Sequence, residues 1–537
     1  MYLSELSNSL LETPNLAAGD TGMRVRRHRS AVFATFALVL GACSTQDINR
    51  PDVPTSVSKP GYFVATNGSA DGDGSVFRPW DMATALAHPS RVQPGDTIWV
   101  RGGTYTGQLT STLHGEAGQP VVVRQYPGER SIIDGGLAVR GAYSWFWGFE
   151  VMNSNLSALV TAVDVFGAGT KIINMIVHDA AGNGIGLWEG ANDAEVYGNV
   201  LYNVGRAGSS VGRYAHGIYF QNITAGKRLV DNVVLNSYSY NFHGYTENAG
   251  LNNLYLEGNV SFNAGSFVAY GGAEFLIGGG QPVRNMNFTG NYSYRGGGLN
   301  ARNVFGIGAP TPVGNRITNN YLMGTTKISY FDGATFTFNT LGNRAGSHEM
   351  LEFFHNANQS MGSGFVFSNN TYRAPNANNI AAFRRVQGTG SGYSFAQWQA
   401  LGYDGNSDFQ IATMSGTKAV VRPNQYEPGR ANVVVYNWDN LGSVAVNLSA
   451  VLSPGDQFEV REVQDYFGAI VVSGTYNGGM VSLPMTAVTA VRPLGPMNTA
   501  APSTGTEFHT FVVIRKNNCF GAGHGGVDVQ VPLSAVC

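Results

Sequence analysis

The sequence predicts an all-β protein built as a solenoid, in which short strands recur in stacked coils. HGIYFQN at 216–222 returns as FHGYTEN at 242–248. One common spacing relates Tyr219 to Tyr245, Gln221 to Glu247, and Asn222 to Asn248. A spacing that preserves side-chain type indicates repeated copies of one structural unit. Composition agrees, because only 13% of the 537 residues are charged, against about 25% in typical domains, and 71 are glycines, which favour turns.

A looser pattern of strand, Asn, strand recurs through the middle of the chain, as in AEVYGNVLYN, RLVDNVVLN and LYLEGNVSFN. The recurring residues are Asn174, Asn199, Asn232, Asn259, Asn291, Asn319, Asn339 and Asn370. Their spacing fits coils of roughly 20–30 residues that carry insertions. Asn tolerates the left-handed backbone that a sharp corner needs, and stacked Asn side chains can bond one another. We therefore expect an Asn ladder along one corner of the solenoid.

The first 60 residues hold a targeting signal. From Met23 the chain reads MRVRRHRS, then the apolar stretch AVFATFALVL, then GAC ending at Cys43. These are the parts of an export signal whose apolar stretch is too short to span a bilayer. The stretch before Cys43 resembles the lipobox of bacterial lipoproteins, which implies lipidation of that Cys. The expected segments are an upstream misread start at 1–22, a signal peptide at 23–42 and a tether at 43–60, with the exported protein lipid-anchored at the bacterial cell envelope, at the outer membrane or cell surface.

The segment before the repeats contains DMATALAH, a short helix by its composition, followed by PGDTIWVRGGTY as a first coil. With these features the chain resembles the right-handed parallel β-helix proteins, which include pectate lyases, the chondroitinase B and alginate lyase group, and several glycoside hydrolase families. The resemblance covers about residues 61–375. It implies that the helix covers the open end of the solenoid, where strand edges and apolar side chains would otherwise be exposed.

The chain changes character after the last expected coil. Residues 376–429 are loop-rich, and SFAQWQALGYDGNSDF within them is similar to a segment that follows the solenoid in related exported proteins, so we expect a cap and linker. Short strands between turn signals predict a small antiparallel β-sandwich at 430–516. Residues 517–537 form a Gly-rich tail with Cys519 and Cys537, which suits neither a disulfide framework nor a zinc site.

The resemblance implies that substrate lies along the outer face of the first strand of each coil. Those strands are GIGLWEG, HGIYFQN, HGYTEN and AEFLIGG. Because side chains alternate along a strand, inward Ile218 and Phe220 put Tyr219 and Gln221 outward. The same repeat puts Tyr245 and Glu247 outward.

Acidic residues recur in comparable places on these strands, and this column predicts catalytic carboxylates. Glu189, Gln221, Glu247 and Glu274 form it. Stacked coils lie about 4.8 Å apart. Glu247 and Glu274, about one coil apart, are then close to the ~5–5.5 Å that separates the two carboxyl groups of retaining glycosidases. Glu189 and Glu247, about two coils apart, are near the ~6.5–9.5 Å of inverting ones. Neighbouring carboxylates push their pKa values apart, as acid and base roles require. Glycosidic hydrolysis is therefore the favoured reaction.

A second mechanism is β-elimination on a uronic-acid-containing glycan. It must neutralise a carboxylate, abstract the C5 proton and protonate the leaving oxygen, which are tasks for Arg or Lys, His and Tyr. The candidates are His216, His243, Tyr214, Tyr219, Tyr240 and Tyr245, with Arg206, Arg213 and Lys227 in or beside the loops. The calcium-binding acidic cluster and the Lys and Arg positions of pectate lyases and chondroitinase B are not matched. The Asn-Thr-Asp and paired-Asp motifs of polygalacturonase-type hydrolases are not matched either.

The expected partner is a polysaccharide. Trp188, Tyr219 and Tyr245 offer flat faces for sugar rings, beside polar Gln221. The net charge of −2 without a basic stripe argues against nucleic acid. ADGDGS at 70–75 spaces Asp71 and Asp73 like the first ligands of a calcium loop but lacks the distant Glu, so it predicts a turn. We expect a monomeric polysaccharide-degrading enzyme without a cofactor; a non-catalytic glycan-binding solenoid or adhesin is the alternative from another class.

Overall fold

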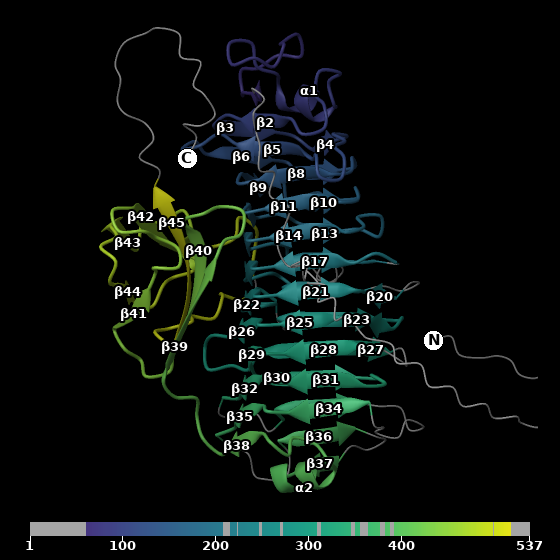
Figure 1. The fold of residues 1–537 in the computed structure, drawn as a ribbon, viewed down its shortest axis with the longest axis vertical. Coiled ribbons are helices and arrows are strands. Elements are labelled where there is room, and N and C mark those ends of the chain that lie inside the picture. Colours follow the sequence, from purple (N-terminus) through teal and green to yellow (C-terminus); the bar gives the residue numbers. More distant parts are fainter. Residues whose placement is uncertain are drawn as a thin grey trace, which may run out of the picture. The chain divides into compact units, whose positions relative to one another are not determined.

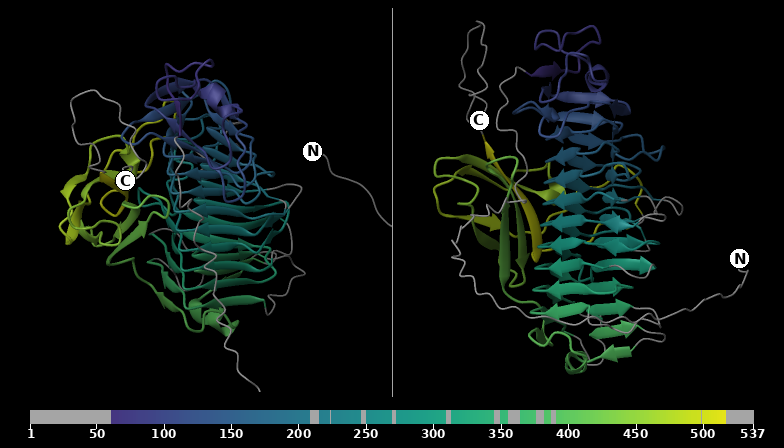
Figure 2. Two further views of the ribbon diagram at one scale, coloured as in Figure 1. Left: turned by 45° about the horizontal axis from the view of Figure 1, so that its top comes forward. Right: turned by 45° about the vertical axis from the view of Figure 1, so that its right-hand side comes forward.

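The computed structural model describes residues 61–516, except 208–214, 223, 246–249, 269–271, 309–312, 345–348, 355–363, 376–381, 387–390 and 498. Its main body is a parallel β-helix with three sheets of 12 strands each. Each coil contributes one strand to sheet A, one to sheet B and one to sheet C, and the coils stack on one another (Figures 1 and 2). This confirms the all-β solenoid that the sequence predicts.

Sheet A contains the strand that precedes the Asn corner of each coil. Its strands are β1 Tyr62–Val64, β2 Thr97–Val100, β5 Val121–Gln125, β8 Ser144–Trp147, β11 Lys171–Ile173, β14 Glu195–Tyr197, β17 Lys227–Val230, β21 Leu254–Glu257, β25 Asn287–Thr289, β28 Asn315–Thr318, β31 Ala334–Thr337 and β34 Phe365–Ser368.

Sheet B contains the strand that follows the Asn corner. Its strands are β3 Gly103–Thr106, β6 Ser131–Asp134, β9 Glu150–Met152, β12 Ile176–His178, β15 Val200–Tyr202, β18 Val233–Leu235, β22 Val260–Phe262, β26 Tyr292–Tyr294, β29 Tyr321–Met323, β32 Thr340–Gly342, β35 Thr371–Arg373 and β38 Asp408–Gln410.

Sheet C is the sheet on which the sequence predicts the substrate. Its strands are β4 Leu109–Ser111, β7 Leu137–Val139, β10 Val163–Val165, β13 Ile185–Leu187, β16 Ile218–Phe220, β19 Phe242–Gly244, β23 Phe275–Gly279, β27 Arg302–Gly308, β30 Thr325–Ser329, β33 Leu351–Phe354, β36 Phe383–Val386 and β37 Ser391–Tyr393. Only β37 runs antiparallel to its neighbour. A separate short pair, β20 Leu251–Asn252 and β24 Val283–Arg284, lies between sheets C and A in the chain order.

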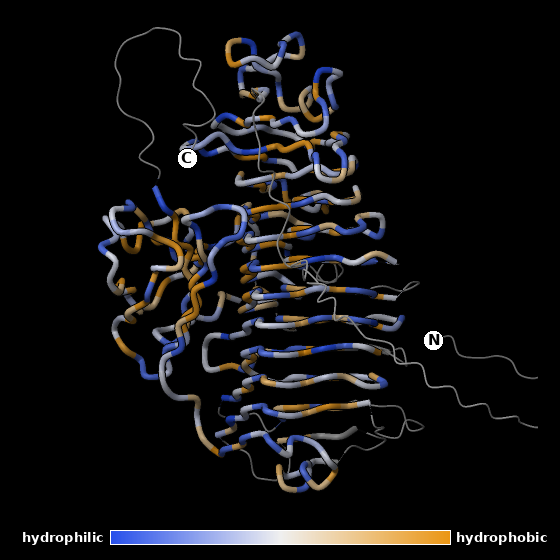
Figure 3. Tube along the Cα trace, viewed as in Figure 1, coloured by the Kyte–Doolittle hydropathy of each residue, from blue (hydrophilic) through white to orange (hydrophobic). Residues whose placement is uncertain are grey.

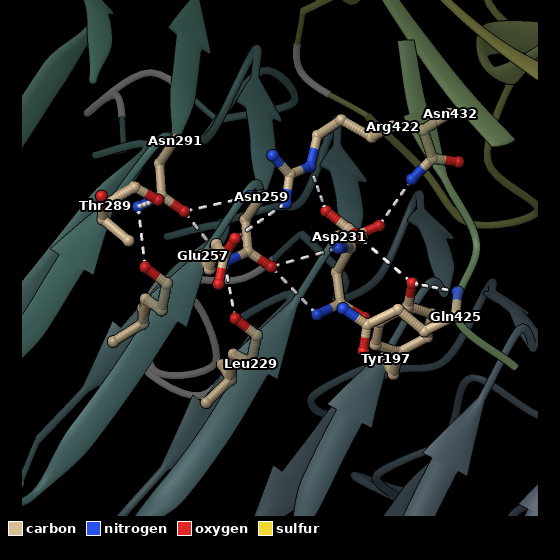
Figure 4. A network of polar contacts seen from close by, with 12 residues as sticks. Tyr197, Leu229, Asp231, Glu257, Asn259, Thr289, Asn291, Arg422, Gln425 and Asn432 are labelled. Carbon is tan, nitrogen blue, oxygen red and sulfur yellow. Dashed lines mark hydrogen bonds and ion pairs between the residues drawn. The ribbon is translucent and has the colours of Figure 1, made fainter. Parts of the chain in front are cut away.

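An Asn ladder lies at the corner between sheets A and B (Figure 4). From the second member onward, each buried Asn side chain accepts hydrogen bonds from the backbone N–H and the side-chain amide of the Asn one coil earlier, at 2.8–3.2 Å, and the first, Asn199, accepts from the Met175 N–H at 2.8 Å. The members are Asn199, Asn232, Asn259, Asn291, Asn320, Asn339 and Asn370. Asp404 ends the ladder by accepting from the Asn370 amide at 2.8 Å.

Two of the expected ladder residues have another role. Asn174 and Asn319 have φ angles of 51° and 59°, in the left-handed region. Each is the first of two residues that form a corner. In the later coil the second residue, Asn320, is the ladder member, whereas in the earlier coil the second residue is Met175. Asn174 instead turns outward and donates to Glu427 Oε2 at 2.9 Å.

The two ends of the β-helix are closed by short helices. α1, Met82–Leu86, begins at the N-cap Asp81 and packs Met82 and Leu86 into the central core. α2, Phe395–Ala400, begins with a capping box at Ser394 and buries Trp398 completely. Helical caps of this kind cover the terminal apolar side chains, as the sequence predicts.

The boundaries at the C-terminal end differ from those expected. Coils continue past 375, because Phe383 of β36 lies in the same core as the earlier coils and β38 still pairs with β35. The antiparallel domain begins with β39 Thr417–Pro423 rather than at 430. Its other elements are β40 Arg430–Asn437, β41 Ser443–Asn447, β42 Gln457–Glu462, the 3₁₀ turn η1 Val463–Asp465, β43 Val472–Thr475, β44 Met480–Pro484 and β45 Phe508–Lys516.

The antiparallel domain packs on the outer face of sheet B. Outward aromatic residues of sheet B, such as Tyr294 and Tyr321, contact Tyr436 and Phe508, with ring centroids 4.4 Å apart for Tyr294–Phe508 and Tyr321–Tyr436. Hydrophobic segments lie both along the coils and in the strands of this domain (Figure 3). Arg422 joins the two parts by ion pairs to Asp231 and to Glu257, the latter at 3.3 Å (Figure 4).

No helix within the described ranges is long and apolar enough to cross a membrane. Segment 70–75 forms a turn, in which Asp73 Oδ1 accepts from the Ser75 N–H at 3.0 Å.

We predict that Asn291→Ala destabilises the protein by about 3 kcal/mol, because it leaves the buried Asn259 N–H and the Leu256 carbonyl without partners. The matched control is Asn287→Ala on the outer side of the same coil, for which a change within about 0.5 kcal/mol is expected. Chemical denaturation of both variants measures the difference. Equal stability of the two variants would contradict a structural role for the ladder.

Candidate active site

The outer face of sheet C carries two parallel columns of side chains. The first lies in the middle of the strands, where the register joins Asp164, Gly186, Tyr219 and His243 on successive coils. The neighbouring residues Ile185, Ile218 and Phe242 point into the core, so the column faces outward. The second column directly follows the strands and consists of Arg140, Phe166, Trp188, Gln221 and Tyr245.

The register differs by two residues from the repeat seen in the sequence. Tyr219 aligns with His243 rather than with Tyr245. Packing inside the coil explains this, because inward Phe220 lies opposite Gly244, where an added Cβ would approach the Phe220 ring to 2.4 Å. Tyr245 still lies outward, next to Gln221.

His216 and His243 form a hydrogen-bonded pair, as their adjacency in the repeat indicated. Nδ1 of His243 lies 2.9 Å from Nε2 of His216, and the rings meet edge to face with centroids 4.2 Å apart. Both imidazoles are nearly buried, with 2% and 8% of their surfaces exposed for His216 and His243. The bond uses Nδ1 of His243 and leaves its Nε2 as the nitrogen that can act on a ligand.

The environment keeps His243 neutral. Burial, and secondly the neighbouring His216, hold the pKa of His243 well below its ordinary value of 6.5. His178 on sheet B shows the opposite case: burial alone would lower its pKa, but the hydrogen bonds that its ring donates to Asp179 and Glu150 outweigh that effect and raise it. A neutral imidazole at neutral pH is a base that can accept a proton.

Tyrosines frame the histidine pair. Tyr240 stacks on His216 with centroids 5.3 Å apart, and Tyr219 lies 5.4 Å from the ring of His243. Tyr245 lies 5.3 Å from the same ring on the other column. The Tyr219 hydroxyl accepts from the Gln221 amide at 2.8 Å and donates to the Tyr245 carbonyl at 3.3 Å. All three tyrosines are half-buried beside the uncharged His243.

Glu274 does not lie in the solvent-facing column where we expected it. Its side chain is completely buried and accepts hydrogen bonds from the Asn241 amide at 3.0 Å and the Ser261 hydroxyl at 2.9 Å. Glu274 lies directly before β23, at the corner where the chain passes from sheet B to sheet C, and its side chain points inward there. Burial raises its pKa to about 7, against the opposing effects of Arg295 and of its hydrogen bonds.

Lys227 also lies away from the substrate face. It begins β17 in register with the core residue Leu254, so its side chain points into the coil and is fully buried. Burial lowers its pKa to about 8, partly offset by Asp193 and Glu189. Lys227 lies directly after the loop, as expected, but it is already the first residue of β17, and the alternation of that strand turns its side chain inward.

The other predicted residues divide into three groups. Trp188 is half-buried on the second column, and Glu189 follows it as an exposed residue. Arg206 holds a neighbouring loop by donating to the carbonyls of Leu156 and Ser157 at 2.6 and 2.8 Å. Glu247, Tyr214, Arg213 and Cys43 lie outside the described residues. Sequence reasoning missed Asp164, Phe166 and Arg140, although the alternation in LAVR and AVDVF would have placed them in the two columns.

Within the part of the chain that the structure describes, no group of three or more His, Cys, Asp or Glu side chains is arranged to hold a metal ion.

Comparison with known proteins supports the fold. Residues 62–265, which include both histidines, match the family model described as "Pel9A-like, right handed beta helix region". A 75-residue segment is 37% identical to pectate lyase PEL9 of Emericella nidulans; it covers 14% of this chain and only 18% of that relative's length.

Similar solved structures include two lyases. The crystal structure of pectate lyase Pel9A has 17% identity and a TM-score of 0.41, and the match covers 68% of this chain and 83% of that one. The alginate lyase of Paenibacillus sp. str. FPU-7 has 15% identity and a TM-score of 0.32, with 61% and 96% of the two chains covered.

We predict that two of the buried histidines titrate on opposite sides of 6.5 in an NMR pH titration of histidine-labelled protein, with the midpoint of His243 below 6.5 and that of His178 above it. His216→Asn should raise the pKa of His243 only in part, because burial is the larger cause. Between 6.5 and its folded pKa, His243 binds a proton more readily in the unfolded chain, so its contribution to stability falls as the pH is lowered. A midpoint at or above 6.5 for His243 would contradict a neutral pair.

Proposed function

We propose that the protein is a polysaccharide-degrading enzyme that cleaves a uronic-acid-containing glycan by β-elimination on the outer face of sheet C. The observation that carries this proposal is the hydrogen-bonded His216–His243 pair among half-buried tyrosines, in which the pKa of His243 is lowered. The similarity of one segment to a pectate lyase supports the same reaction class. The sequence favoured glycosidic hydrolysis, with β-elimination as the alternative, and we now propose β-elimination.

The site residues suit the proton transfers of this reaction. Nε2 of His243 accepts the proton from C5 of the uronate, and the electron pair of the C5–H bond forms the C4–C5 double bond. The C4–O bond breaks, and a tyrosine hydroxyl gives its proton to the leaving oxygen. Tyr219 and Tyr245, on either side of His243, are the candidates for this donor. The proton from C5 moves to the histidine, which then releases it to water, and the tyrosinate takes one proton back from water, so that both groups return to their starting states.

The carboxylates do not support hydrolysis by an acid–base pair. Glu274 is enclosed in the interior, and Asp164 accepts a hydrogen bond from the Trp188 indole at 2.7 Å. Glu189 follows the strand at its far end, whereas Glu274 precedes its strand. Glycosidases need two carboxyl groups facing one bond. Among the described residues, the predicted carboxylates do not meet this requirement.

The substrate carboxylate must be neutralised near the reacting sugar. Arg213, in the loop expected at 206–215, is our candidate for this role. We also propose export and lipidation at Cys43, which would bring the enzyme to polymers outside the cell.

The reaction is tested with purified protein and a panel of polyuronates. We expect ultraviolet absorbance from the unsaturated uronate product, and His243→Gln should reduce kcat by about 10²–10⁴-fold while the thermal unfolding temperature stays near that of the parent. Asn287→Ala, on the outer side of sheet A, is the matched control and should retain the parent rate. Reducing ends without unsaturated product, or full activity of His243→Gln, would contradict the proposal.

A further inference from the structure

A second surface on sheet C extends away from the histidine pair. Its residues belong to the column that directly follows the strands, and each backbone N–H donates to the coil before it. From Tyr245 the column passes through Gln221, Trp188 and Phe166 to Arg140. Four coil steps of about 4.8 Å separate its ends, so Arg140 lies about 19 Å from Tyr245.

The far half of this column is a continuous stack of side chains. The rings of Phe166 and Trp188 are nearly parallel, at 10°, with centroids 6.1 Å apart. The Arg140 guanidinium lies 4.6 Å from the centre of the Phe166 ring. On the other side, Trp188 lies 5.6 Å from Tyr219, next to the histidines. The aromatic residues are half-buried and Arg140 is exposed, so the surface is open to a ligand.

The Trp188 ring is held in a fixed position. Its Nε1 donates to Asp164 Oδ1 at 2.7 Å, on the neighbouring strand. Gly186 makes room for this contact, because an added Cβ would lie 2.8 Å from that oxygen and 3.2 Å from Nε1. A rigid ring loses little entropy when a sugar stacks on it. This arrangement therefore favours a binding platform over incidental packing.

The charge of this surface suits an anion. Arg140 makes no ion pair with any residue that the structure describes, so its guanidinium is available for a carboxylate. The carboxylate of Asp164 already accepts the hydrogen bond from the Trp188 indole. Burial raises the pKa of Asp164, against the opposing effects of Trp188, Thr161 and Arg140. The exposed group at the end of the platform is therefore a cation.

We propose that Arg140, Phe166 and Trp188 form a distal subsite that binds a uronate residue of the same glycan chain whose reacting sugar lies at His243. The exposed edges of the stacked Phe166 and Trp188 rings contact the apolar C–H groups of the sugar, and Arg140 binds a carboxylate. A sugar residue in an extended chain is about as long as one coil step, so the subsite accepts residues several positions from the cleaved bond. This proposal rests on the proposed function for its reaction, but its binding claim can be tested separately.

Affinity electrophoresis tests the binding claim without turnover. The parent and Arg140→Gln are run in gels containing polygalacturonate, alginate or a neutral galactan. We expect a polyuronate to retard the parent and Arg140→Gln to bind it about tenfold more weakly, the effect of losing one charge-assisted hydrogen bond. Arg316→Gln, which removes an exposed arginine of sheet A, is the matched control and should bind like the parent. Absence of retardation in both polyuronate gels, or equal retardation of parent and Arg140→Gln, would overturn the subsite.

Kinetics on size-defined oligouronates separate this proposal from the proposed function. Arg140→Gln should raise KM about tenfold for oligomers that reach from His243 to Arg140, with kcat unchanged, and should leave shorter oligomers unaffected. Trp188→Ala should also raise KM for the oligomers that reach Arg140. If the parent cleaves both lengths but the variants have unchanged KM values, the subsite is wrong and the lyase stands. If the parent protein cleaves none of the oligouronates, the proposed lyase function is wrong, and the affinity electrophoresis alone tests whether the distal subsite binds a uronate.

Discussion

The register between coils is the constraint on which the rest of the structure depends. From Asn199 to Asn370 the Asn corner of each coil bonds to that of the next, and along the solenoid the inward apolar residues of the strands meet their counterparts one coil away. A shift by one residue would turn every outward side chain into the core. The ladder and the core together therefore fix which residues face solvent on sheet C. The histidine pair is a direct consequence, because His243 faces outward only when Phe242 faces inward.

The antiparallel domain restricts where a glycan can bind. It buries the aromatic outer face of sheet B and reaches the corner between sheets A and B through Arg422. Its role is therefore structural at this face. On the outer columns of sheet C, the imidazole of His243, neighbouring tyrosines and two stacked aromatic rings with a guanidinium lie on neighbouring coils. This order of groups suits an extended acidic polymer better than a small sugar.

Much of the fold could be predicted from the sequence, because the Asn corners and the alternation of apolar residues are local patterns. The adjacency of His216 and His243 followed from the repeat alone. The register did not, since matching Tyr219 to Tyr245 ignored the volume of Phe220 opposite Gly244. Glu274 and Lys227 were placed outside because the patterns do not show how a corner redirects a side chain. Partners on different coils, such as Trp188 and Asp164, become visible only once the register is known.

The most direct test of this account is a crystal structure of the His243→Gln variant with a bound oligouronate. The account predicts that C5 of one sugar lies against the side chain at position 243, and that the glycan crosses the coils toward Trp188. Binding of the oligosaccharide across sheet A or on the antiparallel domain, with sheet C empty, would contradict it.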